Sequence, residues 1–283
     1  DFVVALGGGS AMDCAKAASA IALTTDSISL YHSGGKKIED EVLPIIAIPT
    51  TAGTGSEVTS VSVITDESTG FKGPIGSPKL YPKIALIDPE LTYSIPKSIT
   101  ASTGLDVLSH AIEGYWSIHH QPICDALAIY AAKLVFEHVY ATYEDGNNVL
   151  AREKMCEASV IAGLAFTLPK TAASHACSFA LTNLYGMPHG EACAFTLDVL
   201  CQVNAEAEDG RLHKFAKELG FKDAYVLGHE IRKLKEKMGM KVTLSDAGIK
   251  INDLDMLVEK CMHPNMLNNP VEMKEKEIKE MFL

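Results

Sequence analysis

The chain has 283 residues, 47% of them hydrophobic, which is enough apolar material for one large or two ordinary domains with a real core. Its 36 acidic residues outnumber its 25 basic ones, and the formal net charge of −11 repels both the phosphate backbone of nucleic acids and acidic membrane surfaces. No stretch reaches about 20 consecutive apolar residues, and no basic and then apolar leader opens the sequence. We therefore expect no nucleic-acid partner, no membrane span and no signal peptide.

The seven cysteines, at positions 14, 124, 156, 177, 193, 201 and 261, show no paired spacing. Their odd number and scattered positions are typical of reduced, mostly buried thiols, and we expect a cytoplasmic protein. The sequence starts inside an apolar stretch, DFVVALGGGS, without an initiating Met. We take it to open partway through a larger natural domain.

The first predicted unit is a strand, a glycine turn and a helix. An apolar run from Phe2 to Leu6 is followed by three glycines and Ser10, and then by an Ala-rich segment with helical spacing up to Leu23. This order points backbone N–H groups and the positive end of a helix dipole at a ligand above the glycines, usually a phosphate. A tight turn without a ligand fits equally well. The G-x-G-x-x-G fingerprint is absent, because Met12 stands where it has glycine.

A second apolar strand, Leu43 to Ile48, ends in Pro49, Thr50 and Thr51 and then in the polar sequence AGTGSE. Ligand contacts in open α/β sheets gather at the carboxyl ends of the strands. Two strand ends rich in Gly, Ser and Thr therefore indicate one shared nucleotide site, although each is also compatible with a plain polar loop.

After these loops we expect an alternating strand in VTSVSVIT (58–65), a turn in DESTGFK (66–72) and a further strand from Ile84 to Ile87. Lys72 is either a phosphate or ribose contact or a solvated lysine. From Pro96 onward helical periodicity replaces the strand-like runs, for example in 124–140, 149–165 and 223–238. We place the domain boundary near residue 97 and expect an α/β domain in 1–97, an all-helical domain in 98–283 and a ligand cleft between them.

The segment from Thr103 to Trp116 resembles an amphipathic helix that carries Asp106 and His110 on one face, four residues apart. His175 lies in an apolar segment, Thr171 to Leu181, that we expect to be a buried helix, and His189 follows Pro188 at a predicted helix start. One carboxylate and three neutral imidazoles suit Fe²⁺ or Zn²⁺ with a position left for a substrate oxygen. Each histidine alone could also be a hydrogen-bonded core residue. The spacing of Asp106 and His110 is equally compatible with a local hydrogen bond between them.

Taken together, these segments resemble the iron-dependent (group III, metal-containing) alcohol dehydrogenases over nearly the whole chain. The motifs are ALGGGSAMDCAKA (5–17), AIPTTAGTGSEVT (47–59), LIDPELT (86–92), TGLDVLSHAIEGY (103–115) and YGMPHGEACA (185–194), in the family's order. The final NPVEMKEKEIKEMF (269–282) is similar to the family's last helix.

The resemblance implies an NAD(P)-binding α/β domain, partial here, and a helical catalytic domain with an Fe²⁺ (or Zn²⁺) site. The implied ligands are Asp106, His110, His175 and His189. The implied cofactor contacts are Gly8, Gly9 and Ser10 at the pyrophosphate, with Asp13 nearby, the threonines Thr50, Thr51 and Thr54, and Lys72 beside the ribose and nicotinamide. A homodimer is implied as well.

Two features depart from the family's pattern. Phe179 stands four residues after His175, where many members have a histidine proposed to relay protons. The upstream strands that choose between NAD and NADP in the family are also not in this sequence, so that choice stays open.

We therefore expect an NAD(P)-linked oxidoreductase that interconverts an alcohol and an aldehyde or ketone, with the metal polarising the substrate oxygen. A dehydroquinate synthase-like lyase using NAD transiently is the first alternative. The few lysines and arginines around Phe179, Leu181, Cys177 and Met187 disfavour its phosphate-bearing substrate. The second alternative is an inactive metal-binding remnant in this shortened form.

Overall fold

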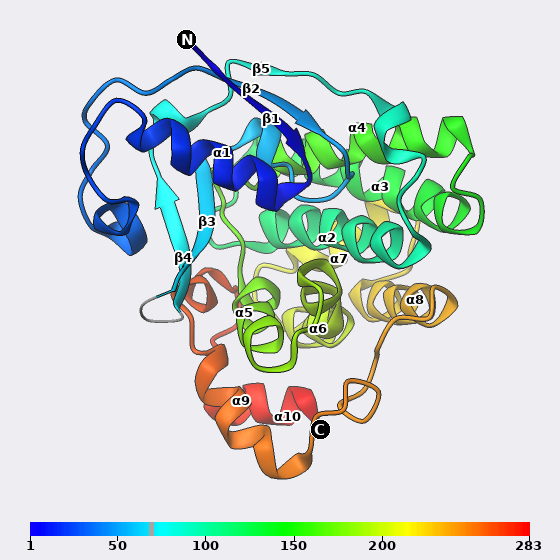
Figure 1. Ribbon diagram of the computed structural model, residues 1–283. Helices are drawn as coiled ribbons and strands as arrows, with labels where there is room; N and C mark the ends of the chain where they lie inside the picture. The colour runs from blue at the N-terminus through cyan, green and yellow to red at the C-terminus, as the bar shows by residue number, and fades with distance from the viewer. Residues whose placement is uncertain (68–70) are drawn as a thin grey trace.

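The computed structural model, which describes residues 1–67 and 71–283, has a short N-terminal α/β region followed by a large helical domain (Figure 1). The α/β region has the helix α1 (Gly9–Ile21) and the strands β1 (Val3–Gly7), β2 (Ile45–Pro49), β3 (Val61–Asp66), β4 (Phe71–Gly76) and β5 (Ile84–Ala85). The helical domain has α2 (Lys97–Trp116), α3 (Pro122–Glu144), α4 (Val149–Phe166), α5 (Ala173–Tyr185), α6 (His189–Asn204), α7 (Arg211–Glu218), α8 (Ala224–Lys237), α9 (Leu254–Cys261) and α10 (Glu275–Phe282). The expected fold class, an α/β part followed by an all-helical part, is confirmed.

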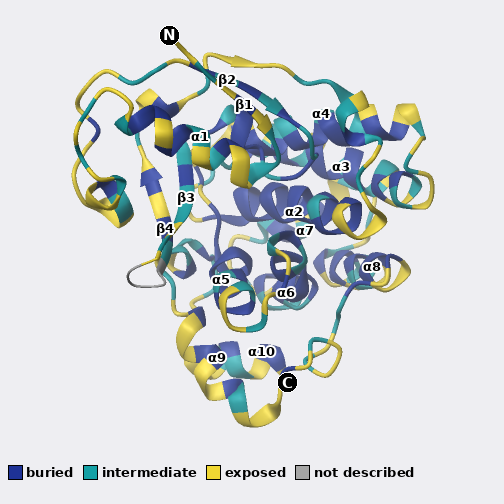
Figure 2. Cartoon of the chain, in the orientation of Figure 1, coloured by how far each residue is buried: buried dark blue, intermediate teal, exposed yellow. Residues whose placement is uncertain are grey.

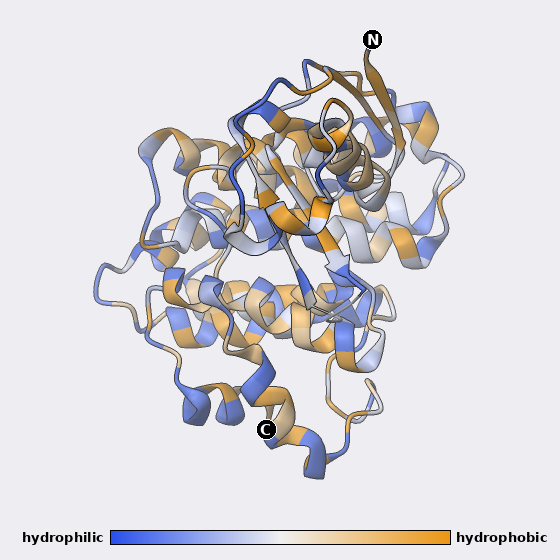
Figure 3. Cartoon of the chain, turned by 60° about the vertical axis from the view of Figure 1, so that its left-hand side comes forward, coloured by the Kyte–Doolittle hydropathy of each residue, from blue (hydrophilic) through white to orange (hydrophobic). Residues whose placement is uncertain are grey.

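Three of the strands form a parallel sheet in the order β1-β2-β5, with Val3 opposite Ile45 and Gly7 opposite Pro49. Because side chains alternate across a strand, Ala5, Ile45 and Ala47 turn inward and pack with Met12 of α1. The alternate residues of β1 are apolar but exposed, and the N-terminal strand is accordingly orange in Figure 3 and largely yellow in Figure 2.

A separate hairpin pairs β3 with β4 antiparallel, with Ser62 opposite Ile75. The strand expected in 58–65 starts later than predicted, at Val61, because the 3₁₀ turn η2 (Ser56–Val58) includes Val58 and has Thr59 as its C-cap. Of the turn expected in 66–72, residues 68–70 lie outside the described part of the chain. The sequence analysis missed β4, whose sequence FKGPIG contains the residues that usually interrupt strands.

The helical domain is organised around α2, in which every residue from Thr100 to Trp116 except Thr103 is buried (Figure 2). This helix packs against α3, α4 and α6 and also contacts α5 and α7. Small residues permit the close packing: a Cβ on Gly104 would lie 2.5 Å from a methyl of Val139. The helices expected from periodicity in 124–140, 149–165 and 223–238 correspond to α3, α4 and α8.

The two regions meet where the loop after β2 packs on α4. A Cβ on Gly55 would lie 2.6 Å from the Cα of Gly163, so the two backbones touch without side chains between them. In the described part of the chain, none of the helices combines the length and the apolar composition that crossing a membrane requires.

Candidate metal centre and cofactor cleft

Helix α2 brings three chelating or orienting side chains to one face. Asp106, His110 and Glu113 lie at positions i, i+4 and i+7, which share a helix face, and all three are buried. The Oδ1 atom of Asp106 has no hydrogen-bond partner within the described residues. A buried carboxylate oxygen without a donor is unfavourable unless a cation or proton compensates it.

Helix α5 brings His175 to the same point. Its Nε2 lies 3.1 Å from the Nε2 of His110 and 3.6 Å from the Oδ1 of Asp106. The other ring nitrogen, Nδ1, contacts the Glu113 carboxylate, which also accepts the backbone N–H of Ser174 at 2.6 Å. Because the carboxylate accepts a hydrogen bond from the N–H at Nδ1, it favours the tautomer in which Nε2 is free to bind a metal.

His189 is the first residue of α6, and Gly190 allows that helix to start directly beside α2. A Cβ on Gly190 would lie 2.1 Å from the carbonyl oxygen of Ser102, so no other residue fits without a backbone shift. The Ser178 hydroxyl donates to the His175 carbonyl at 2.7 Å and lies 3.5 Å from Nδ1 of His189. Its oxygen is therefore available to accept from Nδ1 and leave Nε2 of His189 free.

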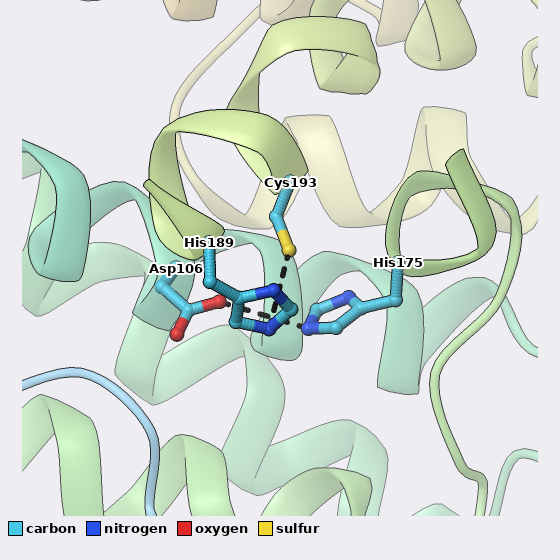
Figure 4. Close-up of side chains that lie close together, drawn as sticks. All are labelled: Asp106, His175, His189 and Cys193. Carbon is cyan, nitrogen blue, oxygen red and sulfur yellow. Dashed lines mark hydrogen bonds and ion pairs between the residues drawn. The ribbon is translucent and has the colours of Figure 1, made fainter. Parts of the chain in front are cut away.

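Sequence reasoning missed Cys193 as a site residue. Its Sγ lies 3.7 Å from Nε2 of His189, and the ligand atoms of Asp106, His175, His189 and Cys193 all lie within 4.8 Å of one another (Figure 4). The spacing that identified Asp106 and His110 would have found it, because Cys193 follows His189 by four residues in one helix. Glu113, three residues after His110, was missed although it shares that face.

The charges in this cluster oppose one another. Burial lowers the pKa of His110 to about 3, against the opposing effect of Asp106, so its imidazole is neutral at ordinary pH. Burial alone would raise the pKa of Asp106, but the neighbouring imidazoles of His110 and His175 outweigh it and hold that pKa well below its usual range. The pKa of His175 is raised, because Cys193 and Glu113 outweigh the opposing effect of burial.

The residues fit a divalent cation. Two imidazole Nε2 atoms lie 3.1 Å apart, and an unpartnered carboxylate oxygen and the Cys193 sulfur lie beside them, so the cluster is a buried set of potential metal ligands. Nitrogen, oxygen and sulfur ligands of this kind bind iron and zinc.

A cavity of about 820 Å³ connects this centre with the loops of the α/β region. Seven of the eight expected cofactor contacts line it: Gly8, Gly9, Ser10, Asp13, Thr51, Thr54 and Lys72. The eighth expected contact, Thr50, is not among the described residues that line the cavity. Its N–H donates to the Gly7 carbonyl instead. Asp106, His110, His175 and His189 line the other end.

The glycine turn has a packing role of its own. A Cβ on Gly9 would lie 2.6 Å from the Cγ2 of Thr54, and one on Gly8 would lie 3.3 Å from the Oγ1 of Thr51. The start of α1 and the threonine loop can therefore approach only because these positions have no side chain. The ligand-free interpretation of the turn and the phosphate interpretation are thus compatible.

A buried lysine, also missed from sequence, ties these loops together. The Lys16 ammonium is fully buried and donates to the carbonyls of Ser56 and Val61 at 2.6 and 2.9 Å. Asp13 accepts from the Ser56 hydroxyl at 2.9 Å and from the Val63 N–H at 3.0 Å. Burial lowers the pKa of Lys16 to about 8, against the opposing charges of Asp13 and Glu57. Asp13 thus shapes the cleft as well as lining it.

Comparison with known proteins agrees with this geometry. The sequence profile of the iron-containing alcohol dehydrogenases matches residues 1–89, and the profile of the C-terminal part of the Fe-containing alcohol dehydrogenase family matches residues 100–283. The chain belongs to the iron-containing alcohol dehydrogenase family. It is a metal-dependent, NAD-linked oxidoreductase that interconverts alcohols and aldehydes.

Several relatives of this dehydrogenase are known in detail. The crystal structure of a sulfoacetaldehyde reductase from Bifidobacterium kashiwanohense, in complex with NAD⁺, is 56% identical, with a TM-score of 0.96, and the match covers 99% of this chain and 75% of that chain. A 1,3-propanediol dehydrogenase from Citrobacter freundii is 36% identical over 100% of this chain and 75% of its own length. A choline dehydrogenase from Bacillus subtilis is 35% identical over 97% of this chain and 71% of its own.

The chemistry of the dehydrogenase divides between the two ends of the cleft. When bound, the metal supplies a Lewis acid for the substrate oxygen, and NAD supplies the hydride acceptor or donor. Glu113 orients His175, the Gly190 contact holds His189 against α2, and the ring of Phe166 stacks on His110 with centroids 4.3 Å apart. These contacts hold the imidazoles in fixed positions and exclude water from one side of the centre.

Phe179, four residues after His175, lines the cleft between His189 and His263. Its ring centroid lies 6.3 Å from that of His189 and 4.5 Å from that of His263. The side chain at this position cannot carry a proton. Burial lowers the pKa of His263, whose Nδ1 accepts the N–H of Asn265 at 3.2 Å.

Proposed function

We propose that this dehydrogenase reduces sulfoacetaldehyde with NADH. The aldehyde carbon accepts a hydride from NADH and the oxygen takes up a proton, which yields 2-hydroxyethanesulfonate and NAD⁺. The observation that carries the proposal is the 56% identity with the sulfoacetaldehyde reductase over 99% of this chain, compared with 33% for a 1,3-propanediol oxidoreductase structure of equal coverage.

The cleft supports a small anionic substrate. Two lysines, Lys72 and Lys170, line it, although the whole chain carries a net charge of −11 and its surface repels anions.

The test is steady-state kinetics of the metal-loaded protein with NADH. Sulfoacetaldehyde is compared with propanal and with 2-(methylsulfonyl)acetaldehyde, a neutral analogue of similar shape. We expect a kcat/KM for sulfoacetaldehyde at least about tenfold higher, since a charge-assisted hydrogen bond discriminates by this factor or more. Equal or better turnover of the neutral aldehydes would overturn the proposal.

For the metal ligands we propose Asp106, His110, His175 and His189, with Cys193 as the alternative to His110. The 3.1 Å approach of the His110 and His175 Nε2 atoms supports His110, and the shared 4.8 Å cluster supports Cys193. Cobalt-substituted protein distinguishes them, because a cobalt–thiolate bond gives an intense near-ultraviolet charge-transfer band. If the band is present in the wild type, and Cys193→Ser loses both the band and stoichiometric metal, then Cys193 is the fourth ligand in place of His110. Metal loss in His110→Ala without that band supports the proposed set.

For the cofactor we propose contacts from Gly8, Gly9, Ser10, Asp13, Thr51, Thr54 and Lys72, with Thr50 acting through the backbone of its loop. The lining of one cavity by seven of these residues supports this set. Titration calorimetry of the 283-residue chain with NADH and NADPH tests it and decides between the two cofactors. Absence of binding to either would favour the inactive remnant.

Three further proposals concern the whole molecule. We propose a domain boundary near residue 97, where α2 begins, supported by the change from strands to helices. We propose a homodimer, as the family resemblance implies, to be tested by light scattering during size-exclusion chromatography. A cytoplasmic location is proposed because all seven cysteines, each within the described residues, are free thiols.

A further inference from the structure

We infer that Lys170 binds the anionic headgroup of the substrate and is the residue that selects a sulfonate over a neutral aldehyde. This inference rests on the proposed function and assigns one side chain of the cleft to substrate specificity. The one-methylene separation between the carbonyl and the sulfonate of sulfoacetaldehyde requires a cation close to the metal centre.

The position of Lys170 meets that requirement. It lies just beyond the end of α4, lines the cavity, and donates its backbone N–H to the carbonyl of Phe166 at 2.8 Å. Phe166 in turn stacks on His110, one of the proposed ligands. A separation of four residues corresponds to one helical turn, about 6 Å, so the backbone of Lys170 starts close to the metal centre.

The charge of Lys170 is also available. Within residues 1–67 and 71–283, its ammonium has neither a hydrogen bond nor an ion pair. Burial raises the pKa of Asp13, and Lys72, the other lysine in the cleft, lies close enough to this carboxyl to oppose that shift. An uncompensated ammonium at the wall of a concave site favours an anion.

The backbone at Lys170 is held in a conformation that lysine does not choose by itself. Its φ is +66°, in the left-handed region where glycine is favoured. Both neighbours are anchored: the Ser117 hydroxyl donates to the Pro169 carbonyl at 2.7 Å, and the Asn268 amide donates to the Thr171 carbonyl at 2.8 Å. A strained non-glycine residue between two fixed neighbours is typical of a functional position.

Polar, uncharged side chains also lie in the cavity wall beside Lys170. The Asn265 amide donates to the Thr171 hydroxyl at 2.8 Å, and Asn265, Asn268 and Thr171 all line the cavity. The Asn265 and Asn268 amides each donate one hydrogen bond to Thr171 and hold the loop, and because both side chains are neutral, Lys170 is the cation of this part of the wall.

The first test measures the ratio of kcat/KM for sulfoacetaldehyde to that for the neutral 2-(methylsulfonyl)acetaldehyde. In Lys170→Gln we expect this ratio to fall about tenfold or more, with the inhibition constant of unreactive ethanesulfonate rising by a similar factor. Lys170→Arg, which keeps the charge, should restore most of the ratio. An unchanged ratio and inhibition constant in Lys170→Gln would overturn the inference while leaving the proposed function intact. A wild-type enzyme without preference for the sulfonate would instead overturn the proposed function.

A second measurement separates recognition from loop structure. Lys170→Gly should raise the melting temperature, because glycine adopts the left-handed conformation without strain, and should still lose the preference for the sulfonate. Ser33→Gly is the matched control, since Ser33 has a φ of +53° and does not line the cleft. It should raise the melting temperature and leave the kinetic ratio unchanged. If Lys170→Gly lowers both quantities, Lys170 acts only by holding the loop and the inference is wrong.

Discussion

The two halves of the cleft are built differently. On the metal side, Leu105, Val107, Leu108, Ala111 and Ile112 of α2 have no exposed surface, and Asp106 and His110 project from this fully packed helix. On the cofactor side, the packed core of the described residues comprises two small clusters. The cofactor loops therefore depend on a few polar contacts where the metal centre depends on extensive apolar packing.

This difference shows where each half is vulnerable. In the helical domain a buried polar residue such as Glu113 is surrounded by packing that survives its loss, so its replacement should affect the metal more than the fold. In the α/β region the Lys16 ammonium connects α1 with the loop after β2 and with β3. Its replacement should affect the local fold first and the cofactor as a consequence.

The largest effect is expected from His189→Ala on the metal side. Removal of a ligand that a rigid helix start positions should abolish stoichiometric metal binding and lower kcat by about a thousandfold or more. Metal content by mass spectrometry and NADH-linked turnover are the measurements. His229→Ala, which replaces an exposed histidine of α8, is the control. Full metal content and rate in His189→Ala would show that the centre does not depend on this residue.

Lys16→Met tests the cofactor side. The substitution keeps the length of the side chain but leaves the Ser56 and Val61 carbonyls without their donor, and we expect a loss of roughly 2–4 kcal/mol in the free energy of unfolding. Calorimetric unfolding together with NADH titration measures it, with Lys37→Met as the control at an exposed lysine of the same region. Metal content should stay at the wild-type level. Loss of metal together with stability would contradict the contrast between the halves.

The pH dependence of stability sharpens the same comparison. Burial lowers the pKa of Lys16 from 10.5 to about 8, so between these values the unfolded chain binds a proton that the folded chain has released. The unfolding free energy should therefore rise with pH across this interval, by no more than about 3 kcal/mol from this group. The difference between wild type and Lys16→Met in denaturant melts at pH 7.5, 9 and 10.5 isolates it. A flat difference would show that Lys16 stays charged.

Glu113→Gln should weaken metal binding about ten- to hundredfold, because the amide no longer holds His175 as a carboxylate does. Competition with a chelator gives the affinity, and circular dichroism gives the fold. We expect an unchanged melting temperature for the metal-free protein within a few degrees. Wild-type affinity in this variant would mean that packing alone orients His175.

The smallest effect is expected from Asn148→Ala at the start of α4. The Asn148 side chain accepts the N–H of Ala151 at 3.1 Å, and the loss of such a cap costs about 1 kcal/mol. The melting temperature should fall by about 2–4 °C with metal content and kinetics unchanged. A drop as large as that of Lys16→Met would remove the contrast between the two halves.

The sequence by itself determined the features that depend on neighbours within a few turns. The apolar strand at β2, the spacing of Asp106 and His110, and the helix start at His189 all follow from local periodicity and local chemistry. The family resemblance followed from the same segments. Helical spacing also contained the signals for Glu113 and Cys193, although neither was recognised as part of the site.

Only the tertiary structure decided which of these side chains meet. His175 approaches His110 although 65 positions of sequence separate them, and Lys16 reaches the loop after β2 although 40 positions separate them. Lys170 lines the same cavity as the proposed metal ligands and the proposed cofactor contacts. The pairing of β4 with β3 and the exclusion of Thr50 from the cavity are likewise non-local. Periodicity reports which face of an element is buried, but the partner across that face is set by the packing of the whole chain.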